Sequence, residues 1–251
     1  MEITVLGSGT CVPSLRRSSP CILVDTGTMK MLLDTGPGSL HQMLKAGITI
    51  NDIDFIIYSH FHVDHTAEMA PFIFASMYAP ESFRTRPLTI MGPPGLKEFY
   101  RSLTLAYGKW IIPEHFTITW IEAEGGAHEF PSAVVKTIPT QHSGNSMATR
   151  IEGAGSCAVV YSGDSEYCPN LVEISRNADL LILECSFPED MPCVGHLSPS
   201  LAGRVARESQ CKKLLLTHFY PPCDSNDLLT PLRKEYSGDV LLAEDLMKVR
   251  L

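Results

Sequence analysis

The sequence His60-Phe61-His62-Val63-Asp64-His65 places three imidazoles and one carboxylate within six consecutive positions. It closely follows residues 53–58, an apolar run with the length and composition of a buried strand. Imidazole and carboxylate groups are ligands that Zn²⁺, Mn²⁺ and Fe²⁺ prefer. A turn that only faced water would need no such concentration of ligand side chains. The stretch therefore predicts a metal site at the end of a strand.

Other polar residues also follow the ends of apolar runs, so we expect them at the same edge of the sheets. Together with the first stretch, the candidate metal ligands are His60, His62, Asp64, His65, His142, Asp164 and His218. Seven ligands exceed the four that a tetrahedral zinc ion takes, but they suit two ions that share one carboxylate. Because paired metal ions lower the pKa of bound water towards about 7 and hold the attacking and leaving oxygens, the set predicts a hydrolase.

The remaining histidines fall into two groups. His41, His115 and His128 have no candidate ligands beside them, and we expect them to be surface or structural residues. His196 lies in the loop 195–199, just before a predicted helix. It is either a loop residue that caps this helix, or a histidine that takes part in catalysis or orients the ligands.

Short apolar, β-branched runs recur along the chain with turn residues between them, which is typical of strands. The predicted strands are 3–6, 21–24, 31–33, 53–58, 88–91, 116–121, 134–138, 158–161, 180–183, 214–216 and 240–242. The predicted helices are 40–46, 67–77, 96–105, 169–175, 200–208 and 228–235. Early hairpin-like pairs and later strand-helix-strand units predict an α/β fold of four layers. It is an αββα sandwich, in which two mixed sheets pack on each other with helices outside.

The chain of 251 residues is 44% hydrophobic and 19% charged, and we expect residues 1–251 to form a single hydrolase domain. No apolar run reaches the about 18–20 residues of a transmembrane helix, so no membrane contact is expected. The strand-like residues 1–7 lack the features of a signal peptide, which predicts a cytoplasmic location. The eight cysteines form no Cys-x-x-Cys pair and are expected to be reduced thiols.

The formal net charge of −8 disfavours extended contact with nucleic acid, because an acidic surface repels the phosphate backbone. Such contact would need a local basic patch. The compact candidates near the expected site loops are Arg16-Arg17 and the pair Arg84 and Arg86. The alternative is that these arginines are solvated charges on loops.

The ligand motifs resemble those of the metallo-β-lactamase superfamily of binuclear metal hydrolases. Its signature, His-x-His-x-Asp-His, is present at 60–65, and His142, Asp164 and His218 match the later motifs in order. Within the superfamily the chain is most similar to the ribonuclease Z group. The stretches that carry this similarity are Leu6-Gly7-Ser8-Gly9-Thr10-x-x-Pro13, Asp34-Thr35-Gly36, Arg86-Pro87-Leu88-x-Ile90-x-Gly92-Pro93-Pro94-Gly95-Leu96, Leu183-Glu184-Cys185-Ser186-Phe187 and Gly195-His196.

This resemblance implies two divalent ions, Zn²⁺ or alternatively Mn²⁺, that share the seven ligands. The implied sets are His60, His62 and His142 on one ion, Asp64, His65 and His218 on the other, and Asp164 between them. His196 matches the family histidine thought to contact the phosphate and assist the leaving group. Asp64 and His196 are thus the expected catalytic residues. Asp34 would be a buried residue that orients the ligand loops.

The resemblance also implies a phosphodiesterase, acting on an RNA 3′ end or on a small or cyclic phosphodiester, and a homodimer. Three features depart from the tRNA-processing members. His142 and Asp164 are 22 positions apart, which leaves no room for their protruding tRNA-binding arm. The family's His-Ser-Thr is His196-Leu197-Ser198 here, and no Arg-Tyr follows His218. Together with the negative charge, these departures favour a small or short substrate over pre-tRNA.

Two other functions are compatible with a metal site of this kind. One is a lactonase or thioesterase, since the same metal centre can attack an acyl carbon. His196 and the stretch from Arg86 to Leu96 argue against it. The other is a metal-bound interaction module without activity, against which the complete set of ligands argues.

Overall fold

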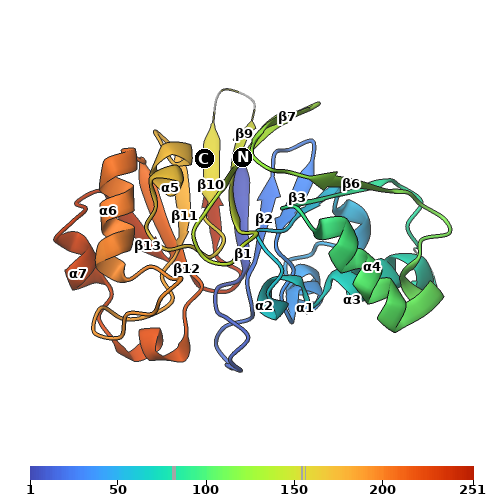
Figure 1. The fold of residues 1–251 in the computed structure, drawn as a ribbon, viewed down its shortest axis with the longest axis horizontal. Helices are drawn as coiled ribbons and strands as arrows, with labels where there is room; N and C mark the ends of the chain where they lie inside the picture. Colours follow the sequence, from blue (N-terminus) through green and yellow to red (C-terminus); the bar gives the residue numbers. More distant parts are fainter. Residues whose placement is uncertain (81–82, 154, 156) are drawn as a thin grey trace.

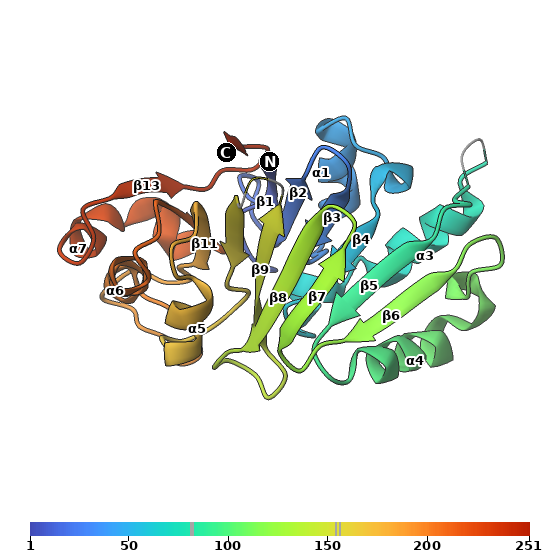
Figure 2. The ribbon, with the colours of Figure 1, turned by 90° about the horizontal axis from the view of Figure 1, so that it is seen from above.

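Two mixed sheets packed face to face, with helices on both outer faces, make up the protein (Figures 1 and 2). The computed structural model describes residues 1–80, 83–153, 155 and 157–251. Within these residues each sheet has seven strands. The predicted α/β sandwich of four layers is therefore confirmed.

The first sheet has the strand order β14-β1-β2-β3-β4-β5-β6. Its strands are β1 (Glu2–Gly7), β2 (Cys21–Asp25), β3 (Lys30–Leu33), β4 (Phe55–Ile57), β5 (Leu88–Gly92), β6 (Ile118–Glu122) and β14 (Lys248–Arg250). Strands β14 to β3 pair antiparallel, and β3 to β6 pair parallel. Because β14 pairs with β1, the two chain ends lie side by side (Figure 1).

The second sheet repeats this plan, with the order β13-β12-β11-β10-β9-β8-β7. Its strands are β7 (Gly126–Phe130), β8 (Ala133–Pro139), β9 (Met147–Gly153), β10 (Ala158–Tyr161), β11 (Leu180–Glu184), β12 (Lys213–Thr217) and β13 (Asp239–Leu242). Strands β7 to β10 pair antiparallel, and β10 to β13 pair parallel. The parallel strands of both sheets end at one edge of the molecule.

Helices cover the outer face of each sheet (Figure 1). They are α1 (Ser39–Lys45), α2 (Val63–Thr66), α3 (Met69–Tyr78), α4 (Leu96–Tyr107), α5 (Pro169–Ile174), α6 (Pro199–Ser209) and α7 (Leu229–Arg233), with 3₁₀ turns η1 (Ile50–Asp52), η2 (Gly108–Ile111) and η4 (Pro221–Ser225). Buried residues of α1, α3 and α4 pack against the first sheet, and those of α5, α6 and α7 against the second.

Successive side chains along the strands of the first sheet point to opposite faces, and each face contributes to a different hydrophobic core. In β2, Ile22 and Val24 belong to the core between the sheets, whereas Cys21 and Leu23 pack under the helices. Both faces are thus buried, and a strand buried on both faces is a continuous apolar run in the sequence. This explains why the strands could be predicted from apolar runs.

The predicted helix 67–77 is wrong at its start, because Ala67 and Glu68 are not helical. They form a turn that separates α2 from α3. The amide of Glu68 donates to Thr35 O, and its carboxylate accepts from the amides of Gly38 and Leu40 at 2.7 and 2.6 Å. Helix α1 leaves these N–H groups without partners of its own. This turn therefore lets Glu68 satisfy the N-terminus of α1.

Neither cysteine pairing nor a membrane-spanning segment is found in the described residues. All eight cysteines are free, as the prediction of reduced thiols requires. Burial raises the pKa of the Cys185 thiol well above its usual range, so this thiol is inert. In the described part of the chain, no helix has the length and apolar composition needed to cross a membrane.

Candidate metal centre and active site

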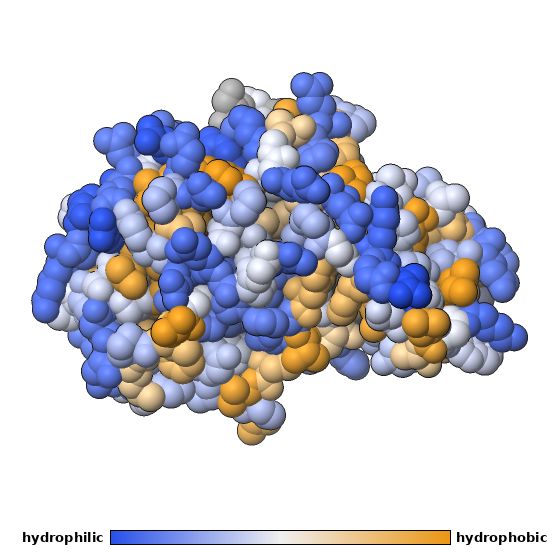
Figure 3. Space-filling view, in the orientation of Figure 1, coloured by the Kyte–Doolittle hydropathy of each residue, from blue (hydrophilic) through white to orange (hydrophobic). Residues whose placement is uncertain are grey.

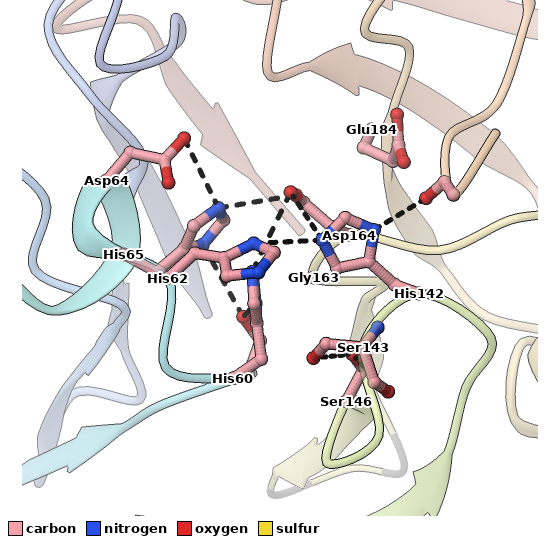
Figure 4. Close-up of polar contacts among 12 residues, drawn as sticks. His60, His62, Asp64, His65, His142, Ser143, Ser146, Gly163, Asp164 and Glu184 are labelled. Carbon is pink, nitrogen blue, oxygen red and sulfur yellow. Dashed lines mark hydrogen bonds and ion pairs between the residues drawn. The ribbon is translucent and has the colours of Figure 1, made fainter. Parts of the chain in front are cut away.

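The seven predicted ligands converge at the edge where the parallel strands end. His60 follows β4, Asp164 follows β10, and His218 follows β12 directly. Figure 4 shows the side chains from the first sheet approaching His142 and Asp164 from the second. Gly163 allows the two halves to meet, because a Cβ there would lie 2.4 Å from the Cβ of Ser59. Its φ of +57° also favours glycine.

One group of ligand atoms faces one oxygen of Asp164. His62 Nδ1 and His142 Nε2 lie 3.1 Å apart. Asp164 Oδ2 lies 3.6 Å from His142 Nε2 and 3.8 Å from His60 Nε2. His62 is exposed and His60 is fully buried, so this group opens to solvent on one side only.

The second group faces the other oxygen of Asp164. The Nε2 atoms of His65 and His218 lie 3.3 Å apart, and each lies 3.3 Å from Asp164 Oδ1. Asp64 Oδ2 completes the group, at 3.5 Å from His218 Nε2 and 3.8 Å from His65 Nε2. Asp164 thus presents one oxygen to each group.

These atoms fit divalent metal ions. In a tetrahedral site with bonds of about 2.0–2.1 Å, neighbouring ligand atoms lie about 3.3–3.4 Å apart, close to the observed separations. His60 Nε2 and Asp164 Oδ1 are buried without a hydrogen-bond partner, and such atoms are costly unless something pairs with them. Among the described residues, the ion pairs of Asp64 and Asp164 are all with histidines. The centre therefore has the donors, the spacing and the negative charge for metal binding.

The charge states of His60, Asp64 and Asp164 agree with this. Burial and the charge of His65 lower the pKa of His60 to about 2, so its ring is neutral and has a free lone pair. Burial raises the pKa of Asp64, but its hydrogen bond with His218 and the charge of His65 outweigh burial and lower that pKa to about 2. Burial likewise opposes the ionisation of Asp164, whereas the surrounding histidines hold its pKa well below the usual range. These ionised carboxylates and the neutral His60 are the forms that bind metals. Burial lowers the pKa of His65, but the charges of Asp164 and Asp34 outweigh burial and raise it well above its ordinary value, so a metal ion at His65 would have to displace a proton.

Asp34 is hydrogen-bonded to both ends of the segment 59–65, the ligand turn, which carries four of the ligands. It is fully buried, and its Oδ2 accepts hydrogen bonds from His65 Nδ1 at 2.8 Å, Ser59 Oγ at 2.8 Å and Tyr161 OH at 2.7 Å. Its Oδ1 accepts from the amide of Ser59 at 2.8 Å. Since Ser59 Oγ also lies 3.0 Å from His60 Nδ1, Asp34 fixes two ligand rings through their far nitrogens. These contacts are those that the orienting role implied by the family resemblance would require, and that role stays a prediction.

A second buried carboxylate, Glu184, fixes His196 and His218. Its Oε1 lies 2.9 Å from His196 Nδ1, and its Oε2 accepts from Ser186 Oγ at 2.7 Å. Ser186 Oγ lies 2.9 Å from His218 Nδ1. Burial lowers the pKa of His196, but the hydrogen bond and charge of Glu184 outweigh burial and raise it above its ordinary value. The His196 ring lies among the ligand rings, with its centroid 4.8 Å from that of His142 and 5.8 Å from that of His218.

His142 is held by the peptide of Gly195. Its Nδ1 donates to Gly195 O at 2.7 Å, and the amide of Gly195 donates to Glu166 Oε1 at 2.6 Å. Because Nδ1 carries the proton, Nε2 keeps its lone pair towards Asp164. The loop that carries His196 thereby also positions His142, a ligand of the group that contains His60 and His62.

Several residues that hold the ligands are not predicted from the sequence. They are Ser59, Tyr161, Glu166 and Ser186. Ser59 and Ser186 lie within one or two positions of strand ends, which is a signal that could have identified them. Tyr161 is 127 positions from Asp34, and nothing local in the sequence connects the two.

The histidines outside the centre are placed as predicted. His41 and His115 are exposed, and His128 is half-buried in β7. As for the cysteines, none belongs to the groups of ligand atoms found among the described residues.

The four arginines considered as a basic patch are engaged in structural contacts. Arg16 and Arg17 both pair with Asp224, and Arg17 also donates to a backbone carbonyl. Arg84 is 1% exposed and donates to four carbonyl oxygens, so neither a basic patch nor a solvated loop charge describes it. Arg86 pairs with Asp54 at the start of β5, away from the centre.

The loop 8–20, between β1 and β2, protrudes at the same edge as the metal centre (Figure 1). Leu15 is fully exposed there, and Val12 is 43% exposed. Figure 3 shows apolar side chains gathered along this lower edge of the molecule. The rim on this side therefore includes exposed apolar residues beside Arg16, which is paired with Asp224.

A family model described as β-lactamase superfamily domain matches residues 29–219, which is most of the chain and includes all seven ligands. The chain belongs to the β-lactamase superfamily. A protein named ribonuclease Z from Mycobacterium sp. (strain KMS) is 30% identical over 276 residues, covering 100% of this chain and 96% of that protein. The predicted resemblance to ribonuclease Z is thus confirmed over the full length.

Solved structures show the same fold. The metallo-β-lactamase fold protein YhfI from Bacillus subtilis has a TM-score of 0.84 at 28% identity, covering 99% of this chain and 98% of that one. The short form of human tRNase Z has a TM-score of 0.78 at 23% identity, covering 100% and 99%. With the ligand geometry, these likenesses confirm the predicted enzyme class, a metal-dependent hydrolase of the phosphodiesterase type.

Proposed function

We propose that this chain is a phosphodiesterase with two divalent ions, Zn²⁺ or alternatively Mn²⁺, and a small or short substrate. The observation that carries the proposal is Asp164, whose two oxygens face two separate groups of ligands. His60, His62 and His142 would hold one ion, and Asp64, His65 and His218 the other. When bound, two such ions supply Lewis-acid charge to the phosphoryl group and lower the pKa of water. We propose that residues 1–251 act as one domain, since both sheets contribute ligands.

The chain's own residues supply the proton and the orientation. Glu184 accepts the proton of His196 Nδ1, so His196 Nε2 is the nitrogen left to donate to a leaving oxygen. Asp34 and Glu184 hold the surrounding rings in place. Asp64, between His65 and His218, contributes charge at the reacting centre.

Two features support a small or short substrate over pre-tRNA. The segment between His142 and Asp164 forms the paired strands β9 and β10, and its described residues form no α-helix and no further strand. Arg16 and Arg17, on the loop 8–20 at the same edge as the centre, are paired with Asp224. A nucleic acid needs several free cations to neutralise its phosphates.

Hydrolysis of bis(p-nitrophenyl) phosphate by the protein loaded with Zn²⁺ or Mn²⁺ tests this function. We expect turnover that a chelator removes and the metal restores. On an alkyl diester, whose basic leaving oxygen must be protonated, His196→Ala should lower kcat by about 10²–10⁴-fold, the range for loss of a proton donor, at unchanged metal content. His41→Ala, at an exposed histidine outside the centre, should have no effect.

Four results would contradict the proposal. The metal-loaded protein could lack turnover, or His196→Ala could retain full activity on the alkyl diester. A lost ion in His196→Ala would instead make His196 a ligand, since it lies within ligand distance of Asp164 and His218. Rapid turnover of an acyl-homoserine lactone in place of the diester would favour the lactonase alternative.

We further propose that a second copy of the chain covers the apolar surface formed by α3 and η2. A pocket of about 550 Å³ there is lined by Ala70, Pro71, Phe74, Tyr107, Trp110 and Ile111. Trp110 is 52% exposed and Phe74 is 44% exposed. Contiguous apolar surface of this kind marks interfaces rather than free surface.

Light scattering tests the homodimer. The wild type should have the mass of two chains at micromolar concentration, and Trp110→Glu should shift it to one chain, because a carboxylate would be buried in an apolar interface. Leu229→Glu, at a 39% exposed residue of α7, is the matched control and should stay dimeric. A monomeric wild type, or a dimeric Trp110→Glu, would contradict the prediction.

A further inference from the structure

A stacked aromatic pair lies beside the metal centre and is not used by the proposed chemistry. The rings of Phe187 and Tyr220 lie 4.5 Å apart between centroids and 19° from parallel. Phe187 lies 6.0 Å from the ring of His196, and Tyr220 lies 6.3 Å from it. Tyr220 also lies 6.0 Å from the ring of His218. We call Phe187 and Tyr220 the aromatic wall.

The backbone holds this wall rigidly. The amide of Tyr220 donates to Ser186 O at 3.2 Å, and the thiol of Cys223 donates to the same carbonyl at 3.2 Å. Pro221 then begins the turn η4, which fixes the direction of the chain. The neighbouring Ser186 is itself bonded to Glu184. A stacking surface that is already ordered loses little conformational entropy on binding.

Both rings are partly exposed, although each is large and apolar. Because both rings lie beside His196, their exposed parts are within reach of a ligand at the centre. Aromatic rings bind planar groups by stacking, and nucleobases are planar groups that stack in this way.

The charges around the wall restrict the part of a ligand that extends beyond the planar group. Residues 184–200 and 218–228 contain no lysine or arginine, and they include Glu189, Asp190, Asp224 and Asp227. Arg17, which stacks on Phe219, is already paired with Asp224. Further phosphates beyond the first base would therefore meet no free cation on this side.

From these observations we infer that the aromatic wall binds a single nucleobase carried by the alcohol that leaves the phosphorus. This inference rests on the proposed phosphodiesterase function and names its substrate as a nucleoside diester. The leaving side is assigned because the wall adjoins His196, the proposed donor to the leaving oxygen. The wall positions the substrate and takes no part in proton transfer.

The methyl diester of adenosine 5′-phosphate tests the assignment through its products. Water can expel adenosine and leave methyl phosphate, or expel methanol and leave adenosine 5′-phosphate. A wall on the leaving side predicts adenosine and methyl phosphate. The methyl diester of ribose 5-phosphate, which lacks the base, should be a poorer substrate by about tenfold in kcat/KM, mostly through KM.

Tyr220→Leu and Phe187→Leu should each remove most of this preference for the base, whereas Tyr220→Phe should retain it. The matched control is Phe130→Leu, which removes a ring from another aromatic pair with a centroid distance of 4.5 Å, between Phe55 and Phe130. It should keep the preference of the wild type.

The outcomes separate the wall from the phosphodiesterase itself. The proposed role of the aromatic wall would be overturned if the products were adenosine 5′-phosphate and methanol, or if both leucine variants kept the preference for the base. If bis(p-nitrophenyl) phosphate is turned over at the same time, the phosphodiesterase function stands. Absence of turnover of every diester by the metal-loaded protein would overturn the function, and the wall with it.

Discussion

Replacing Asp164 with alanine is expected to abolish both metal binding and hydrolysis. Asp164 is the residue whose two oxygens face both groups of ligands, at 3.3 Å from two histidines on one side and 3.6 Å from a third on the other. Loss of a group that only orients a ligand typically costs about 10–100-fold in metal affinity or activity. The loss of a ligand shared by two ions should exceed this range.

Metal content and thermal unfolding measure the effect independently of activity. A ligand that binds the native state alone raises the melting temperature in proportion to the logarithm of its concentration over Kd. Zn²⁺ should therefore stabilise the wild type and leave Asp164→Ala almost unchanged. Asp239→Ala, at a half-exposed surface carboxylate, is the control and should respond like the wild type. Two bound ions per chain in Asp164→Ala would contradict the assignment.

The ligands could be predicted because each follows an apolar run, and strands buried on both faces are the clearest signal in this sequence. His60, Asp164 and His218 were found in this way, and the sheets bring them together. Their mutual arrangement was implied by the family resemblance, but it could not be derived from the apolar runs. It depends on strand order, which pairs β4 with β5 in one sheet and β10 with β11 in the other.

Three strands, β7, β9 and β14, were not predicted from the sequence. Strands β7 and β14 lie at the edges, and their sequences, Gly126–Phe130 and Lys248–Arg250, include exposed polar or charged residues. Strand β9 is central, but it carries Arg150 and Glu152, which pair with each other at 2.7 Å. An apolar run is absent in all three cases, so the pairing with neighbours, rather than the local sequence, defines these strands.

The contacts that support the ligands were the least predictable part of the centre. Asp34 was assigned an orienting role from its motif, but its partners Ser59 and Tyr161 come from elsewhere in the chain. Glu184 was noted only as part of a stretch, although it fixes His196. Such contacts leave no periodicity in the sequence, because each joins two strand ends that only the fold brings together.

Asp34→Ala is expected to be the most destabilising change in the centre, even in the metal-free protein. The carboxylate accepts four hydrogen bonds, from Ser59 N, Ser59 Oγ, His65 Nδ1 and Tyr161 OH, and all these groups are buried. Each donor left unpaired costs about 1–3 kcal/mol, and breaking a buried charged pair by removing one partner costs about 3–5 kcal/mol. Because these terms are not additive, we expect a loss of about 3–5 kcal/mol in the free energy of unfolding.

Urea unfolding of the metal-free proteins measures this loss. Asp34→Asn separates the effect of the lost charge from the effects of the backbone conformation and the lost acceptor oxygens. Asp34 has a φ of 60°, a left-handed conformation that asparagine tolerates better than alanine. Asparagine also keeps one acceptor oxygen but loses the charge beside His65, so its loss should be intermediate. If Asp34→Ala and Asp34→Asn are equally destabilising, the charge contributes more to stability than the backbone conformation or the number of acceptors. If alanine unfolds at the same urea concentration as the wild type, Asp34 does not hold the ligand turn, and the fixed orientation of His60 and His65 must have another source.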